Sequence, residues 1–196
     1  MLALLDIQHA GKPSRPSDMG AAFDLDGDGV TGENGEREVD LVRAYVAAAK
    51  SHLEAHGVVV EVLTAGEYGT RHVKANALAA GHAKAVYVAC HVNAGKGDYG
   101  LVEYDARSPR GAQLADLAAA DLRALPGIKR GVTKGLGAGD RGFSCIDGIY
   151  AGPKGLCAIL YEPGFIDAPA HRGLWTAGGL VQVGCTLALT LEAWAA

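Results

Sequence analysis

Short apolar runs alternate with longer segments of helical periodicity along this chain, and this alternation constrains the fold more than any other feature. Strand-like runs lie at about 2–7, 58–63, 84–90, 100–104 and 156–161, and helix-like segments at about 36–56, 71–81, 109–124 and 169–194. Strands that alternate with helices predict an α/β fold. We therefore expect a single α/β domain over residues 1–196, with a mixed or mainly parallel twisted sheet flanked by helices on both faces.

Composition supports one compact domain and argues against several classes of partner. The chain has 196 residues, of which 49% are apolar, so it is long enough to bury a sizeable core. The net charge is −4 and no basic cluster stands out, which gives no electrostatic reason to bind nucleic acid or an anionic membrane surface. The 28 glycines gather near 10–36, 94–100 and 127–155. We expect long loops there that line a site.

The two ends of the chain and its cysteines predict where the protein is made. The N-terminal MLALLDIQHAG lacks a basic leader and a long apolar core, so we expect a strand, no signal peptide and synthesis in the cytoplasm. The apolar stretch after residue 177 is broken by Gln182, Gly184 and Glu192, which predicts a buried terminal helix rather than membrane insertion. The cysteines lack a C-x-x-C pair and predict buried free thiols, with disulfides as the alternative; they are Cys90, Cys145, Cys157 and Cys185.

Four short segments each carry a histidine or a glutamate that could take part in a metal site. These residues are His9, Glu36, His91 and Glu162. Two imidazoles and one carboxylate can hold a tetrahedral Zn²⁺ and leave one position open for water, while another carboxylate moves protons. Each histidine alone is more often structural. Glu36 also has an ordinary role, since acidic residues are favoured in a first helical turn. Helical periodicity places Glu38 nearer than Glu36 to the apolar face, so the local pattern does not choose between them.

Five segments in this order carry a family resemblance: DIQHAG, GENGEREVDLV, CHVNAG, KRGVTKGL and ILYEPGFID. Together they resemble the zinc-dependent N-acetylmuramoyl-L-alanine amidases of the amidase-3 family. The resemblance implies His9, Glu36 and His91 as ligands of one Zn²⁺ and Glu162 as the catalytic carboxylate. Leu41 matches the leucine that follows the helical glutamate of the family, and for this reason we choose Glu36 over Glu38.

Three departures from the family pattern put the shape of the substrate groove in question. The first block reads Asp-Ile-Gln-His-Ala-Gly where the family usually has Pro-Gly-His-Gly. Asp40 stands at the position of the helical asparagine, and Asp167 replaces the usual final asparagine. The proposed ligands are unaffected by all three.

The resemblance also implies an activity and a biological setting. It implies hydrolysis of the amide between the lactyl group of N-acetylmuramic acid and the L-Ala of the stem peptide, with peptidoglycan as the partner. We expect a monomeric phage endolysin that acts on the bacterial cell wall after its release; a bacterial autolysin and a catalytic domain cut from a longer enzyme are alternatives. Two other functions stay open: a zinc peptidase or carboxypeptidase, because the same chemistry cleaves other amides, and a wall-binding module without activity.

The loop DLDGDGV predicts a second ion site. Asp24, Asp26 and Asp28 alternate before Gly29, as in oxygen-rich Ca²⁺ loops. The match is partial because the twelfth position, which holds a bidentate acid in such loops, falls on Gly35. A solvated turn is the alternative.

Other polar residues have weaker functional interpretations. His52 and His56 are four apart, but the order His-Leu-Glu-Ala-His puts the glutamate out of place for a helical zinc-protease motif. Cys90 should point away from His91 into the core, because adjacent strand residues face opposite sides. Arg130 and Lys134 could contact an anionic stem peptide or lie in a solvated loop.

Overall fold

A six-stranded mixed sheet forms the centre of the protein. The computed structural model describes every residue except 150, 151, 153 and 155. The strands are β1 (Leu2–Ile7), β2 (Val59–Leu63), β3 (Ala85–Cys90), β4 (Tyr99–Asp105), β5 (Arg130–Leu136) and β6 (Leu156–Glu162). Their spatial order is β2-β1-β3-β6-β4-β5, in which the first four are mutually parallel and β4 runs antiparallel to β6. The predicted mixed α/β sheet is confirmed.

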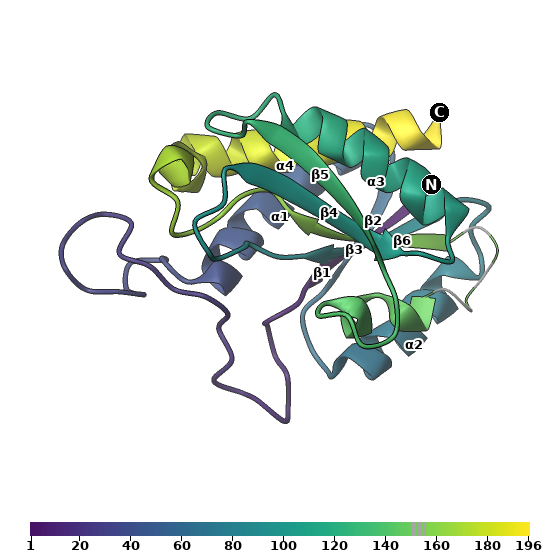
Figure 1. Ribbon diagram of the computed structural model, residues 1–196. Helices are drawn as coiled ribbons and strands as arrows, with labels where there is room; N and C mark the ends of the chain where they lie inside the picture. The colour runs from purple at the N-terminus through teal and green to yellow at the C-terminus, as the bar shows by residue number, and fades with distance from the viewer. Residues whose placement is uncertain (150–151, 153, 155) are drawn as a thin grey trace.

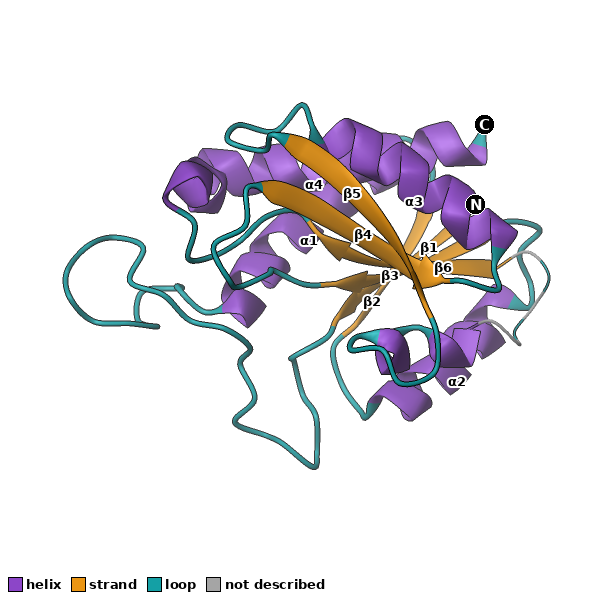
Figure 2. Ribbon diagram, viewed as in Figure 1, coloured by secondary structure: helices purple, strands orange, loops and turns teal. Residues whose placement is uncertain are grey.

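Helices cover both faces of the sheet (Figure 2). One face packs against α1 (Glu38–Ala55), α3 (Pro109–Leu122) and α4 (Ala177–Ala195). The other packs against α2 (Tyr68–Ala79) and the 3₁₀ helices η1 (Phe143–Cys145) and η2 (Asp147–Ile149). Burial on both faces explains why β1 and β3 are almost continuously apolar.

The periodic segments of the sequence match the observed elements closely. The five predicted strands are present, and the predicted helices at 36–56, 71–81 and 109–124 correspond to α1, α2 and α3. The last predicted helix divides into η3 (Pro169–Trp175) and α4, because Thr176 is extended and its side chain caps α4 by accepting from the Gly179 amide. Among the described residues no single helix is long and apolar enough to cross a membrane. In the same part of the chain, η3 and α4 reach the required length and hydropathy only when they are taken together, and the angle between them is 83°.

One element departs from the prediction. Strand β5 lies in the glycine-containing stretch 127–155, which we expected to be loop. It pairs in parallel with β4, and Gly131 brings it close to α3, where a Cβ would stand 1.7 Å from the Ala119 carbonyl oxygen. Tertiary contacts with β4 and α3 therefore make a strand out of a sequence with little apolar alternation.

Loops at the carboxyl end of the parallel strands create the place for a site. β1 is hydrogen-bonded to β2 on one side and β3 on the other, so the connections that leave β1 and β3 diverge. A crevice at such a switch point is the usual ligand position in open α/β sheets. The connection from β1 to α1, residues 8–37, is long and extends away from the body of the protein (Figure 1).

Candidate active site

The candidate site lies where the chain leaves three parallel strands. His9 follows β1, His91 follows β3, and Glu162 is the last residue of β6. Glu38, the first residue of α1, reaches the same place from the helix N-terminus. All four side chains line one cavity of about 630 Å³. The sequence prediction that His9, His91 and Glu162 share a region is therefore consistent with the geometry.

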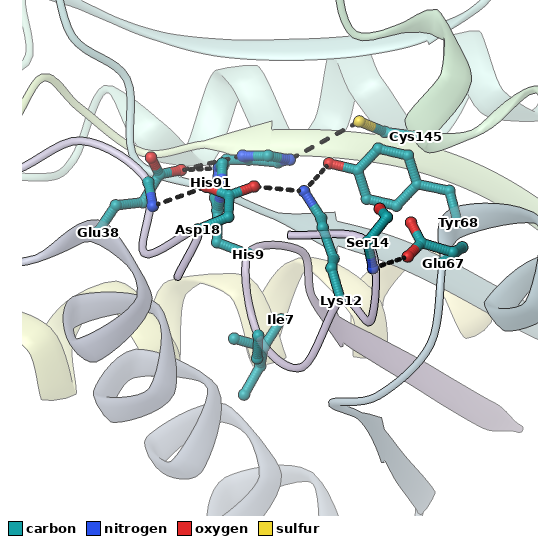
Figure 3. A network of polar contacts seen from close by, with 12 residues as sticks. Ile7, His9, Lys12, Ser14, Asp18, Glu38, Glu67, Tyr68, His91 and Cys145 are labelled. Atoms are coloured by element: carbon teal, nitrogen blue, oxygen red, sulfur yellow. Dashed lines mark hydrogen bonds and ion pairs between the residues drawn. The ribbon is translucent and has the colours of Figure 1, made fainter. Parts of the chain in front are cut away.

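A compact group of three side chains forms the inner part of this cavity (Figure 3). The Glu38 Oε1 atom lies 2.9 Å from His91 Nδ1 and 3.4 Å from His9 Nε2. The two imidazole rings stand edge to face, with centroids 5.1 Å apart. One ligand atom from each residue lies within 4.8 Å of the others, which is close enough for a single ion to contact all three.

The glutamate that the structure places beside the histidines is Glu38, and not Glu36 as the family resemblance implied. The Glu36 carboxylate is buried in the preceding loop, where it accepts the backbone amides of Leu25, Asp26 and Gly32. Helical periodicity places Glu38 nearer the apolar face of α1, although this pattern alone did not choose between the two glutamates. Alignment through Leu41 selected Glu36, which lies two residues before the glutamate that faces the histidines.

Backbone amides and the two histidines keep the Glu38 carboxylate in place and ionised. Ala21 N donates to Oε2 at 2.9 Å and Val92 N donates to Oε1 at 3.0 Å. Burial raises the pKa of Glu38, but the hydrogen bonds from His9 and His91 outweigh it, and the pKa lies well below its usual range. The pKa of His9 is raised, since its hydrogen bonds to Glu38 and Asp18 outweigh the effect of burial.

A second carboxylate orients His9 from the opposite side. Asp18 Oδ1 lies 2.8 Å from His9 Nδ1, and its Oδ2 lies 2.9 Å from Lys12 Nζ, which in turn donates to the Tyr68 hydroxyl at 2.7 Å (Figure 3). Burial of Asp18 is outweighed by the hydrogen bonds from Lys12 and His9, and its pKa falls to about 2. Because Asp18 holds a proton on Nδ1, Nε2, which faces Glu38, is the nitrogen that can lose its proton and coordinate a metal ion. Sequence reasoning missed Asp18 because it lies in an aperiodic loop.

Replacement of Asp18 by asparagine is expected to lower metal affinity by about 10–100-fold, the usual effect of losing an outer carboxylate partner of a ligating histidine. The measurement is competition for Zn²⁺ against a chromophoric chelator. Glu67→Gln is the matched control, since Glu67 accepts the exposed Ser14 amide at the rim of the same network, away from His9. Equal affinities for Asp18→Asn and wild type would contradict the orienting role.

Glu162 lies in a negatively charged part of the cavity. Asn93 Nδ2 donates to its Oε2 atom. Burial, together with the charges of Glu103 and Glu38, raises the pKa of Glu162 to about 8, although Arg141 and Lys134 lower it in part. A carboxyl group with a pKa near the working pH is suited to accepting and returning a proton.

The loop with three aspartates lies outside this cavity. Asp24 accepts the amides of Gly27 and Gly29, at 2.7 and 3.0 Å, and Asp28 accepts the Val30 amide at 2.8 Å. These bonds are those of a tight turn. The Asp24, Asp26 and Asp28 carboxylates lie close enough to share an ion, so Ca²⁺ binding stays a prediction.

The remaining residues singled out from the sequence have distinct positions. Arg130 stacks on the Tyr99 ring, 5.4 Å from its centroid, whereas Lys134 lines the cavity and lies 3.4 Å from Glu103. Cys90 is buried in the core as expected, and all four cysteines are free thiols. Asp167 accepts the amides of Gly95 and Lys96, both at 3.0 Å, and so holds the loop after His91.

Comparison with known proteins gives structural relatives only. No protein-family model matches the chain, and no curated protein matches it in sequence. Among solved structures it is similar to Cwp6 from Clostridium difficile (TM-score 0.76, 20% identity), covering 98% of this chain but only 29% of Cwp6. It is also similar to the N-acetylmuramoyl-L-alanine amidase AmiC2 of Nostoc punctiforme (TM-score 0.72, 18% identity), with 100% of this chain and 97% of AmiC2 covered.

A third neighbour is the catalytic domain of the CD27L endolysin targeting Clostridia difficile (TM-score 0.67, 15% identity), with 96% of this chain and 97% of that domain covered. Other structural neighbours are also N-acetylmuramoyl-L-alanine amidases. At these identities the likeness establishes a shared fold, and activity has to be argued from the site.

Proposed function

We propose that this chain is a zinc-dependent N-acetylmuramoyl-L-alanine amidase that acts on the peptidoglycan of the bacterial cell wall. The observation that carries the proposal is the meeting of His9, Glu38 and His91 in one cavity with Glu162. The structural neighbours described as amidases, and the one described as an endolysin catalytic domain, support the same substrate class.

The three inner residues fit a zinc ion by their chemistry. Their donor set is two imidazole nitrogens and one carboxylate oxygen, which suits Zn²⁺ and leaves its fourth position for water. Glu38 is buried and ionised beside two imidazoles, and it supplies the negative charge that a divalent cation requires. His9, Glu38 and His91 are therefore the proposed ligands.

Zinc bound there would supply Lewis-acid chemistry, lowering the pKa of a water molecule and polarising the amide carbonyl. Glu162 then accepts the proton of the attacking water and returns it to the nitrogen of the leaving amine. Asn93 holds Oε2 of that carboxylate during both transfers. Burial raises the pKa of Glu162 above that of a free carboxyl group, to about 8 in the metal-free protein, and so favours its acceptance of the water proton.

Product analysis on purified peptidoglycan tests this function. We expect free stem peptides that begin with L-Ala, loss of turbidity, inactivation by a chelator and recovery with Zn²⁺. Released D-Ala or split cross-links would instead support a zinc peptidase. A wall-binding module would bind walls without lowering turbidity, whether or not zinc is added.

Arg141 is a candidate for binding the carboxylates of the stem peptide. It lines the cavity, is exposed and forms no ion pair with any described residue. Arg141→Gln is expected to raise KM by about 5–30-fold, the value of one charge-assisted hydrogen bond of about 1–2 kcal/mol. Loss of the Arg141 charge should also raise the pKa of Glu162, so kcat should stay nearly unchanged only on the alkaline plateau of the pH profile, where Glu162 is ionised in both proteins.

Arg130→Gln is the control for this prediction, because Arg130 stacks on Tyr99 and does not line the cavity. Steady-state kinetics on a soluble muropeptide measures both variants. Equal KM values for the two variants would contradict a role of Arg141 in substrate binding.

A further inference from the structure

A second group of potential metal ligands lies at the far end of α1. His52 is in the last turn of α1, His56 is its C-cap, and Glu192 is near the end of α4. Glu38 begins the same helix, so the two groups stand roughly 20–25 Å apart at about 1.5 Å of helix rise per residue. The group is therefore separate from the candidate active site.

The three side chains face one another across the α1–α4 contact. Glu192 Oε1 lies 2.8 Å from His56 Nδ1, and Oε2 lies 3.5 Å from His52 Nε2. The two imidazole rings have centroids 4.3 Å apart. As in the active-site group, one ligand atom from each residue lies within 4.8 Å of the others.

His52 Nε2 is an unusual atom in this group. It is buried from solvent and has no hydrogen-bond partner among the described residues, although it points toward Glu192. A buried polar atom without a partner is costly. Coordination of a metal ion by Nε2 would satisfy it and use the nearby carboxylate as well.

Close helix packing holds the group in place before any ion binds. Gly184 of α4 lies against α1, where a Cβ would stand only 2.3 Å from the Tyr45 carbonyl oxygen. Lys84 Nζ donates to the Ala195 carbonyl and anchors the end of α4. Ligands carried by two packed helices need little reorganisation to bind an ion.

We propose that His52, His56 and Glu192 bind a divalent first-row transition-metal ion that links the ends of α1 and α4. Two imidazoles at positions i and i+4 on a helix face the same side. Nitrogen donors with one carboxylate suit Zn²⁺, Ni²⁺ or Cu²⁺ and not Ca²⁺ or Mg²⁺. The ion stabilises the folded chain because it binds only where both helix ends are in place.

A simple ion pair is the competing interpretation, since histidines at a helix C-terminus interact favourably with the helix dipole and with Glu192. The two interpretations differ in metal stoichiometry. A simple ion pair predicts no saturable binding of a metal ion at this end of α1. The metal site predicts that one equivalent of metal ion binds there and that its binding depends on all three residues.

Titration of the metal-free full chain with Zn²⁺ tests the proposal, by calorimetry and by competition with a chelator. We expect two equivalents for wild type and one each for His52→Asn and for Glu38→Ala. Zn²⁺ should raise the melting temperature of the single variant Glu38→Ala. It should not raise that of the double variant that combines Glu38→Ala with His56→Asn. Glu54→Gln, on the same helix end but paired with Lys50, is the control and should keep both equivalents.

The outcomes separate this site from the proposed active site. One equivalent that is lost in Glu38→Ala and kept in His52→Asn would overturn the second site and leave the amidase proposal intact. One equivalent that is lost in His52→Asn and kept in Glu38→Ala would support the second site and count against zinc at the active site. Equal stabilisation of Glu38→Ala by Ca²⁺ or Mg²⁺ would also overturn the proposed metal class.

Discussion

Glu162→Gln is expected to lower the rate of amide hydrolysis by about 10²–10⁴-fold, the usual contribution of a general acid–base group. The substitution keeps the size of the side chain and removes only its ability to take a proton. Metal content should stay at the wild-type value, because Glu162 stands outside the group formed by His9, Glu38 and His91. Hydrolysis of a soluble muropeptide, with metal analysis of the same samples, measures both effects.

Glu103→Gln is the matched control, because Glu103 is a buried carboxylate in the same cavity. It should keep most of the activity. The negative charge of Glu103 helps to raise the pKa of Glu162, so its removal should move the acid limb of the pH profile to lower pH. A Glu162→Gln protein that no longer binds zinc would show that Glu162 is a metal ligand and not the catalytic base.

The raised pKa of Glu162 also predicts how activity and stability change with pH. Activity should rise as pH passes through the pKa of Glu162, because the base works only when ionised, and the charge of bound Zn²⁺ should place this rise below the value of about 8 that holds for the metal-free protein. The folded metal-free protein holds this proton more tightly than the unfolded chain, whose carboxyl has a pKa near 4.5. The wild-type protein therefore loses stability as pH rises from about 4.5 through about 8.

Glu162→Gln lacks this titration, so its stability relative to wild type should increase over the same pH window. Each pKa unit corresponds to about 1.4 kcal/mol, and the gain should amount to a few kcal/mol by pH 9. Urea unfolding of both metal-free proteins at pH 5 and pH 9 measures it. An equal difference at the two pH values would contradict burial of an ionisable Glu162.

Glu38→Ala is expected to abolish metal binding at the active site and activity with it. Glu38 is the carboxylate between the two imidazoles, so its removal should cost more than the about 10–100-fold typical of an outer partner. Two backbone amides, of Ala21 and Val92, would also lose their acceptor. Zinc competition and muropeptide hydrolysis check the two losses.

Glu36→Gln is the paired variant, since the two glutamates are neighbours in sequence and have different surroundings. Glu36 accepts amides of the 25–32 loop and touches neither histidine. The variant should keep its metal and lose about 1–3 kcal/mol of stability through weakened buried hydrogen bonds. Loss of metal from Glu36→Gln, with retention of metal by a Glu38 variant, would show that Glu36 is the ligand, as the family resemblance implied.

Sequence alone determined the layered α/β architecture and the positions of His9, His91 and Glu162 at the ends of strands. Period-2 and period-3.6 patterns are local, because each element must present its own apolar face to the core. Parallel strands bring their carboxyl ends to one edge of the sheet, and the observed strand order β1-β3-β6 makes the residues at the ends of these three strands neighbours. This part of the site follows from topology.

Only the tertiary structure decided between Glu36 and Glu38, identified Asp18 and made β5 a strand. The conformation of the long connection after β1 sets which glutamate faces the histidines, and aperiodic loops carry no local signal for it. Asp18 reaches His9 through that same loop. β5 forms because it pairs with β4 and packs against α3. The seven residues of β5 carry no local pattern that predicts these contacts. Contacts between segments far apart in the chain decide these features, so they appear only when the chain is folded.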